Sequence, residues 1–323
     1  MLRNVCFLAA ISLFICLGGC DKSGSSSSSS GKKKLVIAVI PKSVEHVFWK
    51  TVEAGARQGE KETGCEVRWQ GPNTEADRAT EIRIVADMIT QGVDAICVAP
   101  SDANALVDVI TDAHKKVPVI VFDSGVNTED YTAFIATDNR RGGEIGGQYM
   151  LKLIGDAGGK VAVMRGVAGS QSTTEREEGF IAAVKTNPKV QVIEVRGENE
   201  TATSQRAAAD VLQKDPDVVG FFGCSEPATK GVLLALEDAG RAGKIKFVGF
   251  DGGQELATGM DKKEIDALVV QKPVLMGEMA VKAAVDACNG KPVQKIQKIE
   301  PQLITQENKD QPPIRELLVP KVK

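Results

Sequence analysis

Short apolar runs alternate with longer amphipathic stretches along most of this 323-residue chain. A continuous apolar run is typical of a β-strand buried on both faces, and the amphipathic stretches have helical spacing. This alternation predicts parallel sheets covered by helices on both faces. The expected strands are Leu35–Ile40, Glu66–Trp69, Ala95–Ala99, Val119–Phe122, Phe134–Ala136, Val161–Met164, Val190–Val195, Val219–Phe222, Lys246–Phe250 and Ile265–Val270. The expected helices are Phe48–Thr63, Ala76–Thr90, Ala103–Lys115, Arg141–Ile154, Thr174–Lys185, Thr203–Gln213, Ala228–Ala239 and Val274–Asn289.

One sheet rarely holds so many strands, so we predict an α/β protein with two doubly wound parallel-sheet lobes joined by a hinge. The first series of elements gives way to the second near Thr137–Asn139. We expect residues 34–137 and 272–300 to form the N-terminal lobe, and residues 138–271 and 301–323 to form the C-terminal lobe. We expect the polar stretch 306–323 to pack loosely along one lobe, and we assign it no role.

The N-terminus has the pattern of an export signal. Arg3 is followed by the apolar run Val5–Leu17, which is short for a membrane span and leads into Leu17-Gly18-Gly19-Cys20. This pattern predicts a signal peptide over residues 1–19 and lipidation of Cys20; a plain secretory signal or a retained anchor is the alternative. Residues 20–33 are rich in serine and indicate a flexible tether. We therefore expect a lipoprotein anchored at the periplasmic or extracytoplasmic face of a membrane.

Charge and composition exclude several classes of partner. The formal net charge is −3, and it becomes −4 without residues 1–19 because only Arg3 is lost. A mildly acidic body whose only basic cluster is Lys32–Lys34 argues against nucleic-acid binding. The mature cysteines other than Cys20 form no CxxC pair, and we expect them to be buried thiols: Cys65, Cys97, Cys224 and Cys288.

The sequence lacks the usual motifs of cofactor and catalytic sites. There is no Walker loop, no GxGxxG after a strand and no GxSxG, and the glycines at 142, 143, 146 and 147 indicate close helix packing instead. The only histidines, His46 and His114, are far apart in the pattern, so we expect no metal site and no cofactor. A binding protein is favoured over an enzyme, although a hydrolase or isomerase that uses Cys224 or the aspartates of a cleft stays open.

Polar side chains follow several of the predicted strands. Asp123, Thr137, Asp251 and Gln271 each come directly after a strand, and Arg176 lies in the first turn of a helix. Ligands of open parallel sheets bind beyond the carboxyl ends of the strands, so these side chains are candidate ligand contacts. Nearby aromatic rings offer flat apolar faces for the C–H surface of a sugar ring: Phe48, Trp49 and Phe250.

Each candidate also has a structural alternative. Asp123 and Asp251 can cap a helix or turn, and Arg176 can be a solvated helix residue. Thr137 and Gln271 can be hinge residues that bond the backbone, and His46 can lie in a surface loop. Phe48 and Phe250 can belong to the core, whereas Trp49 is favoured for the cleft. Cys224 is more often a packed thiol than a ligand contact or a nucleophile.

Six motifs together resemble the periplasmic sugar-binding proteins of the ribose/galactose type, the solute receptors of ABC importers. The resemblance covers nearly all of residues 34–304. The motifs are Val39-Ile40 through Phe48-Trp49, Val119-Ile120-Val121-Phe122-Asp123, Ile135-Ala136-Thr137-Asp138-Asn139 with Gly142-Gly143, Arg176-Glu177-Glu178-Gly179-Phe180, Val248-Gly249-Phe250-Asp251-Gly252, and Gln271 before Pro273. The resemblance implies a type I periplasmic-binding-protein fold.

The resemblance also implies roles for particular residues. It places Asp123, Thr137, Arg176, Asp251 and Gln271 at sugar contacts, and Phe48, Trp49 and Phe250 at ring-stacking positions. Several neighbours depart from the family pattern. Ser124 stands in place of an arginine, His46 in place of an asparagine, Cys224-Ser225 in place of Asn-Asp, and Asn199 in place of an aromatic residue. Because an unpaired buried polar group costs about 1–3 kcal/mol, these changes can redirect specificity away from ribose.

The sequence therefore predicts a monomeric receptor that closes around a monosaccharide or polyol and delivers it to an ABC permease. The ligand contacts expected from the sequence are His46, Phe48, Trp49, Asp123, Thr137, Arg176, Phe250, Asp251 and Gln271. A partner that reports a sugar-like signal to a membrane sensor is the alternative function. A sugar-responsive repressor is disfavoured, because a repressor needs a DNA-binding headpiece where this chain has its lipidation motif.

Overall fold

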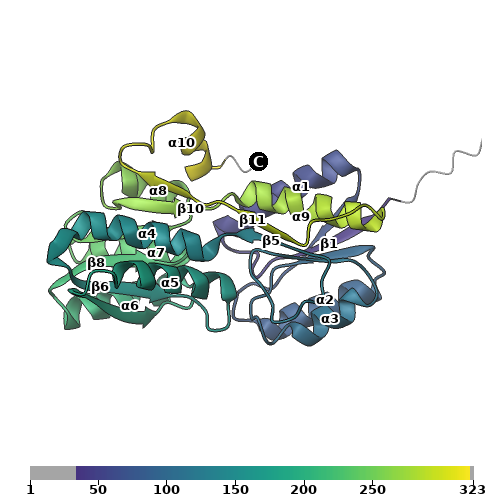
Figure 1. The fold of residues 1–323 in the computed structure, drawn as a ribbon, viewed down its shortest axis with the longest axis horizontal. Helices are drawn as coiled ribbons and strands as arrows, with labels where there is room; N and C mark the ends of the chain where they lie inside the picture. The colour runs from purple at the N-terminus through teal and green to yellow at the C-terminus, as the bar shows by residue number, and fades with distance from the viewer. Residues whose placement is uncertain (1–33, 321–323) are drawn as a thin grey trace, which may run out of the picture. The chain divides into compact units, whose positions relative to one another are not determined.

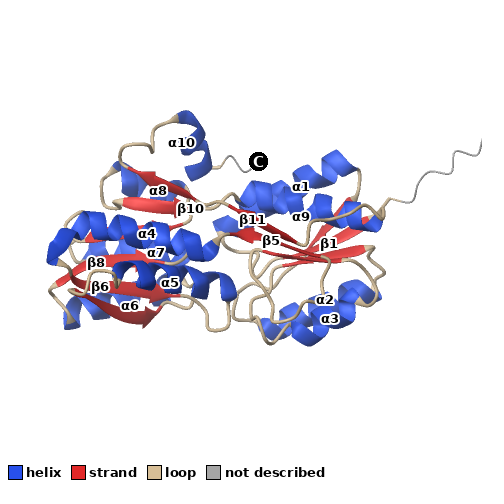
Figure 2. Ribbon diagram, in the orientation of Figure 1, coloured by secondary structure: helices blue, strands red, loops and turns tan. Residues whose placement is uncertain are grey.

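The computed structural model describes residues 34–320, so the predicted signal peptide, Cys20 and the tether lie outside the described residues. From Lys34 onward the chain forms one compact unit. This unit contains two six-stranded sheets flanked by helices (Figures 1 and 2). The predicted fold class, two doubly wound α/β lobes, is confirmed. Between residues 34 and 320, no helix has both the length and the apolar character that crossing a bilayer requires.

The sheet of the N-terminal lobe is parallel throughout, in the order β11-β5-β4-β3-β1-β2. Its strands are β1 (Val36–Ile40), β2 (Glu66–Trp69), β3 (Ala95–Val98), β4 (Val119–Phe122), β5 (Ala133–Thr137) and β11 (Ile296–Ile299). The helices are α1 (Val47–Thr63), α2 (Arg78–Thr90), α3 (Val107–His114) and α9 (Pro273–Cys288). Helices α1 and α9 lie side by side over one core, and α2 and α3 pack over the other (Figure 1). Strands β3 and β4 are buried at every residue, as expected for apolar runs covered on both faces.

The sheet of the C-terminal lobe has the order β12-β10-β9-β8-β6-β7. Its strands are β6 (Gly159–Arg165), β7 (Val190–Arg196), β8 (Val218–Gly223), β9 (Lys246–Phe250), β10 (Ala267–Val270) and β12 (Gln302–Thr305). The helices are α4 (Asn139–Ile154), α5 (Gln171–Val184), α6 (Thr201–Lys214), α7 (Glu226–Asp238), α8 (Gln254–Asp261) and α10 (Pro312–Leu318), with a short 3₁₀ turn, η1 (Gly155–Ala157). Strand β12 runs antiparallel to β10, so the edge of this sheet departs from the predicted parallel arrangement.

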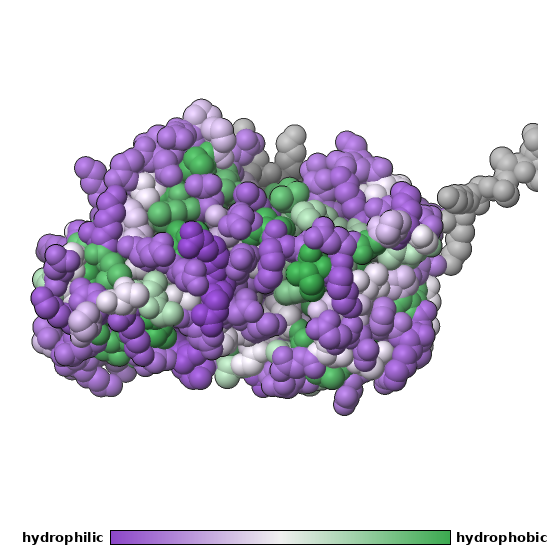
Figure 3. Space-filling model, viewed as in Figure 1, coloured by the Kyte–Doolittle hydropathy of each residue, from purple (hydrophilic) through white to green (hydrophobic). Residues whose placement is uncertain are grey.

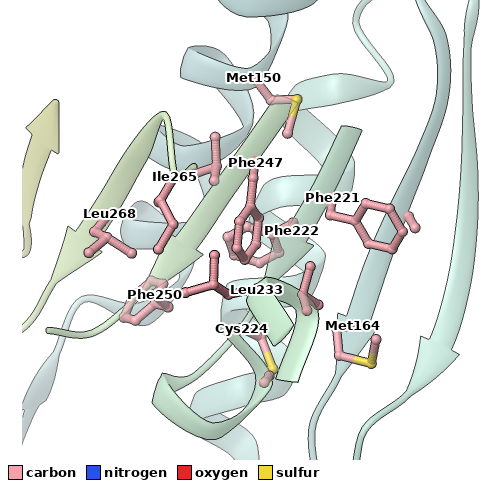
Figure 4. Close-up of a cluster of buried hydrophobic side chains, with 14 of the residues drawn as sticks. Met150, Met164, Phe221, Phe222, Cys224, Leu233, Phe247, Phe250, Ile265 and Leu268 are labelled. Carbon is pink, nitrogen blue, oxygen red and sulfur yellow. The ribbon is translucent and has the colours of Figure 1, made fainter. Parts of the chain in front are cut away.

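The core of the C-terminal lobe is built on aromatic residues of two central strands. Phe221 and Phe222 of β8 and Phe247 of β9 are fully buried, and Figure 4 shows them together with Met150 of α4. The Phe222 ring stacks on Phe180 of α5, with centroids 4.1 Å apart. Outside the core, hydrophilic residues predominate on the face shown in Figure 3, and apolar residues appear there in separate patches.

The chain crosses between the lobes three times: from β5 to α4, from β10 to α9 and from β11 to β12. The ends of β5 and β10 therefore bring Thr137 and Gln271 to neighbouring crossovers. Beyond the third crossover, α10 packs on the C-terminal lobe: Leu318 is fully buried, and its carbonyl accepts from the Gly253 amide at 2.8 Å. The prediction that residues 306–323 pack loosely is wrong for α10.

Glycines let α4 and α5 approach closely, as the sequence predicted. A Cβ on Gly143 would lie 2.0 Å from the Arg176 carbonyl oxygen, and one on Gly179 would lie 2.2 Å from the Arg140 carbonyl oxygen. No real side chain tolerates such distances, so these positions require glycine. The close contact fixes the second turn of α5, which carries Arg176, against α4, so the prediction that Arg176 lies in the first turn of its helix is wrong.

Candidate functional site

A cavity lies between the two lobes, beyond the carboxyl ends of their strands. It encloses about 320 Å³, part of which is open to solvent. Most of the residues that line it are polar or charged, and both lobes contribute to it. The lining residues are Lys42, His46, Phe48, Trp49, Glu75, Asp123, Ser172, Thr173, Arg176, Asn199, Ser225, Pro227, Asp251 and Gln271. Seven of the nine side chains predicted to contact a ligand are among them; Thr137 and Phe250 are not.

Asp123 and Asp251 occupy equivalent positions in the two lobes. Each follows a central strand, β4 or β9, and each has a left-handed backbone, with φ of 61° and 69°. Aspartate tolerates this conformation better than most residues, and such backbone strain gathers at functional sites. The strand-end rule thus places both carboxylates in one cavity from opposite lobes.

Asp251 also supports the structure around it. Its Oδ2 accepts from the Glu226 amide at the start of α7, at 2.9 Å, and its Oδ1 accepts from Gln271 Nε2 at 2.8 Å. Burial raises the pKa of the Asp251 carboxyl, and Arg176, Gln271 and the Glu226 amide oppose that rise. Asp251 thus caps the start of α7, a helix that precedes it in the chain and not the following helix or turn of the structural alternative, and it also lines the cavity.

Arg176 is buried and not solvated, so the structural alternative for this residue is wrong. Its Nε donates to Asn139 Oδ1 at 2.8 Å, and its Nη1 donates to the Cys224 carbonyl at 3.1 Å. Nη1 lies 3.9 Å from Asp251 Oδ2. The guanidinium also sits over the Phe250 ring, 4.1 Å from its centroid.

Phe250 does not offer the stacking face that was predicted. It is fully buried in the C-terminal core, where Figure 4 shows it, and its ring supports the Arg176 guanidinium. The aromatic wall of the cavity comes from α1 instead. Phe48 and Trp49 both line the cavity, with ring centroids 5.0 Å apart in an edge-to-face pair.

Thr137 acts through Gln271 and does not reach the cavity. The fully buried Thr137 hydroxyl donates to Gln271 Oε1 at 2.6 Å, and Gln271 donates to Asp251. This chain links two of the crossovers to the carboxylate in the cavity. The predicted direct contact between Thr137 and the ligand is therefore corrected to support of Gln271.

His46 and Asn199, two of the departures from the family pattern, meet at Glu75. His46 Nδ1 lies 3.7 Å from Glu75 Oε1, which also accepts from Trp49 Nε1 at 3.0 Å. From the other lobe, Asn199 Nδ2 donates to Glu75 Oε2 at 2.8 Å. Asn199 in turn accepts from the Ser225 hydroxyl at 2.9 Å. His46 thus lies in the cleft, and Glu75 organises this end of it.

Glu75 is ionised in this setting. Burial disfavours the carboxylate, but the nearby His46 imidazole, the charge of Lys42 and the hydrogen bond from Trp49 lower the pKa of Glu75 to about 2. The pKa of His46 is raised: burial opposes its charged form, and the stronger combined effect of Glu75 and other carboxylates favours it. The Glu75 carboxylate therefore favours the protonated form of the His46 imidazole beside it.

The ionisation of Glu75 predicts a pH dependence of stability. Because its pKa falls from 4.5 to about 2, Glu75 stabilises the folded protein above pH 4.5 and loses this effect as the pH falls towards 2. The advantage of the wild type over Glu75→Gln in unfolding free energy should therefore shrink by about 3 kcal/mol between pH 5 and pH 2. Urea denaturation at a series of pH values measures this difference in unfolding free energy, with the exposed Glu129→Gln as control. A difference that stays constant with pH would contradict this assignment.

The sequence reasoning missed several lining residues. Lys42, Glu75, Ser172 and Thr173 were not singled out, and Asn199 and Ser225 were noted only as departures from the family. Lys42 and Ser225 each lie two residues beyond a strand, β1 and β8. The strand-end rule, applied to every strand with a margin of two or three residues, would have found both and Asn199 as well.

Cys224 is a packed thiol. It is fully buried, burial raises its pKa well above the usual range, and Figure 4 shows its sulfur among core residues. Cys65 and Cys97 are also buried, whereas Cys288 is partly exposed, so the expectation of a buried thiol is wrong there. Within residues 34–320, His, Cys, Asp and Glu form no cluster suited to a metal ion.

Comparisons with known proteins agree with this architecture. Residues 37–292 match the family described as periplasmic binding protein domain. The ribose import binding protein RbsB of Bacillus subtilis is 29% identical over 266 residues, which is 82% of this chain and 85% of that protein. The D-ribose/D-allose-binding protein of Pseudomonas aeruginosa is 30% identical over 258 residues, or 77% of this chain and 80% of the relative.

Solved structures show the same fold. An ABC transporter solute-binding protein from Agrobacterium vitis with bound D-fucose is 34% identical, with a TM-score of 0.85 over 88% of this chain and 99% of that one. A carbohydrate transporter solute-binding protein from Agrobacterium radiobacter in complex with D-arabinose is 28% identical, with a TM-score of 0.86 over 88% and 99%. The match to the family and the two-lobed fold lead to one conclusion: the chain belongs to the periplasmic binding protein family and resembles its ribose-type members.

Proposed function

We propose that this protein is an extracytoplasmic receptor that binds a monosaccharide or a related polyol between its lobes and delivers it to an ABC permease. The observation that carries the proposal is the composition of the cavity wall. Acceptors and donors from both lobes surround the cavity, next to the aromatic wall of Phe48 and Trp49. Such a wall suits a sugar, which has hydroxyl groups around its edge and apolar C–H faces.

The charges in the cavity favour an uncharged ligand. The charged side chains form three pairs, each of a basic and an acidic residue: Lys42 with Asp123 at 3.0 Å, His46 with Glu75 at 3.7 Å, and Arg176 with Asp251 at 3.9 Å. Because each charge has a partner in the protein, an anionic or cationic ligand would bring a charge with no counterpart. A neutral polyhydroxyl compound meets polarised groups and adds no net charge. Neutral sugars of this kind appear in the names of the relatives, which are ribose and allose, and in the solved structures, which hold D-fucose and D-arabinose.

Closure of the lobes is the proposed mechanism. A sugar that touches Asp123 and Trp49 in one lobe and Asp251 and Arg176 in the other binds the closed form better than an open form. The sugar therefore shifts the population towards the closed form, which is the form proposed to dock on the permease. We propose a monomer that neither binds nucleic acid nor acts as an enzyme, because the Cys224 thiol lies in the core and away from the ligand.

Titration calorimetry tests the ligand class. The purified protein is titrated with D-ribose, D-allose, D-arabinose, D-fucose and D-tagatose, and with D-glucuronate and D-glucosamine as charged controls. We expect saturable binding of at least one neutral sugar with a stoichiometry of one, and weaker binding of both charged controls. Well-folded protein that binds no neutral sugar or polyol would overturn the proposal.

The proposed anchor has its own test. If residues 1–19 are removed and Cys20 is lipidated, the mature protein sediments with membranes. We expect Cys20→Ser to block lipidation, so the protein should no longer carry lipid label and should not be processed at that position. Metabolic labelling with a fatty acid measures lipid attachment, and Cys288→Ser, which should be labelled like the wild type, is the control. Equal labelling of Cys20→Ser and the wild type would exclude the anchor.

A further inference from the structure

Lys42 is a buried cation that pairs with a carboxylate of its own lobe and donates hydrogen bonds to two hydroxyls of the other lobe. It follows β1 in the N-terminal lobe, and only 2% of its surface is exposed. Its Nζ lies 3.0 Å from Asp123 Oδ2 in the same lobe, and it donates to Ser170 Oγ at 3.1 Å and Ser172 Oγ at 2.9 Å in the other lobe. Two of the three donors of the ammonium group therefore bind hydroxyls of the C-terminal lobe.

The position of Lys42 compensates for a change elsewhere in the chain. The residue after Asp123 is Ser124, where the family pattern has an arginine. The structure supplies a positive charge to Asp123 from Lys42 instead. Ser124 has a different partner: its Oγ accepts from the Ser172 amide of the C-terminal lobe at 3.1 Å. Lys42 and Ser124 thus both make contacts between the lobes in this part of the cleft.

Other bonds join the lobes beside Lys42. The Ala103 amide donates to the Gly169 carbonyl at 2.9 Å, and Arg78 Nη2 donates to the Ala168 carbonyl. These carbonyls belong to the same loop between β6 and α5 that leads to Ser170 and Ser172. Direct bonds between protein groups, made without any ligand atom, therefore hold this loop against the N-terminal lobe.

We propose that Lys42 is a positioning residue that orients the Asp123 carboxylate towards the sugar and locks the lobes together through Ser170 and Ser172. This inference rests on the proposed function for its effect on sugar binding. Lys42 occupies Asp123 Oδ2, and no residue between 34 and 320 donates to Oδ1. Oδ1 thus accepts from a sugar hydroxyl, and at this point of the site the sugar must be the donor. Specificity here favours a sugar with a hydroxyl group over one that presents a ring oxygen.

Two variants separate the two parts of this role. Lys42→Met removes the charge and keeps most of the apolar stem, whereas Ser170→Ala with Ser172→Ala removes only the bonds to the other lobe. We expect the Kd for the sugar found by calorimetry to rise about 100-fold in the first and about 10-fold in the second. The exposed Lys50→Met on α1 is the matched control and should keep the wild-type Kd.

Small-angle X-ray scattering of the protein without sugar tests directly whether the bonds from Lys42 to Ser170 and Ser172 lock the lobes together. We expect both variants to have a larger radius of gyration than the wild type and Lys50→Met, and thermal melting confirms that each is folded. If Lys42→Met does not fold, the double serine variant decides, because it keeps the pair of Lys42 and Asp123.

A double serine variant with the radius of gyration and Kd of the wild type would overturn the proposal that these bonds lock the lobes together. A folded Lys42→Met protein with unchanged Kd would overturn the positioning of Asp123. If the wild type binds no sugar, the proposed function fails, and the scattering comparison still decides whether the lock exists.

Discussion

Asp251→Asn should weaken sugar binding by about 100-fold while the protein stays folded. Asparagine has the same shape and tolerates the left-handed backbone of this position, with φ of 69°, so the change removes the charge and one of the two oxygens that accept hydrogen bonds. Hydrogen bonds to a charged group contribute about 1.5–3 kcal/mol each, and 1.4 kcal/mol is a factor of ten in Kd. In the proposed mechanism, Asp251 is the carboxylate through which the C-terminal lobe holds its side of the sugar.

Titration calorimetry of the variant against the sugar of the wild type measures this effect. Asp112→Asn, an exposed position on α3, is the matched control and should bind like the wild type. Asp251→Asn with an unchanged Kd would remove Asp251 from the binding site. A variant that neither folds nor binds would leave Asp251 a structural role only, and the thermal melting curve distinguishes that case.

Arg176→Met should lower the unfolding free energy by about 3–5 kcal/mol. The change leaves the buried Asp251 carboxylate without its cation and leaves Asn139 Oδ1 and the Cys224 carbonyl without their donor. It also removes the guanidinium that covers the Phe250 ring. Because the pKa of Asp251 is already raised by burial, loss of Arg176 should also favour its protonated form.

Urea denaturation of both proteins measures the difference. Arg140→Met is the control, because Arg140 pairs with Glu178 at the surface, where both side chains are about half exposed. Pairs of that kind contribute about 0–1 kcal/mol, so the control should be close to the wild type. Equal stability of the two variants would contradict the buried network around Arg176.

The alternation of strands and helices could be predicted from the sequence because buried parallel strands consist of continuous apolar runs. The elements that were missed lack this signal. Strand β11 (Ile296–Ile299) lies at a sheet edge and is largely exposed, so its residues Ile-Gln-Lys-Ile form no apolar run. Helix α8 has only 8 residues and α10 only 7, too few for a clear helical period. Their packing against the C-terminal lobe decides their structure.

The cleft was predictable where one local rule applied and unpredictable where distant groups meet. Strand ends located Asp123 and Asp251 correctly. Phe250 is adjacent to Asp251, but successive side chains of a strand point to opposite faces, so its ring enters the core. A wider strand-end rule would have located Lys42, but the groups that satisfy the charges of Lys42 and Glu75 lie far along the chain. No local sequence pattern predicts which distant residues these partners are.

The account depends on a sugar that both lobes hold at once, and a crystal structure of the protein with the sugar identified by calorimetry tests this most directly. We expect one sugar in the cavity, with hydroxyl groups within hydrogen-bond distance of Asp123 Oδ1 and the Asp251 carboxylate, and with its C–H face against Phe48 or Trp49. A sugar bound to one lobe alone, or outside the cavity between Asp123 and Asp251, would contradict the account.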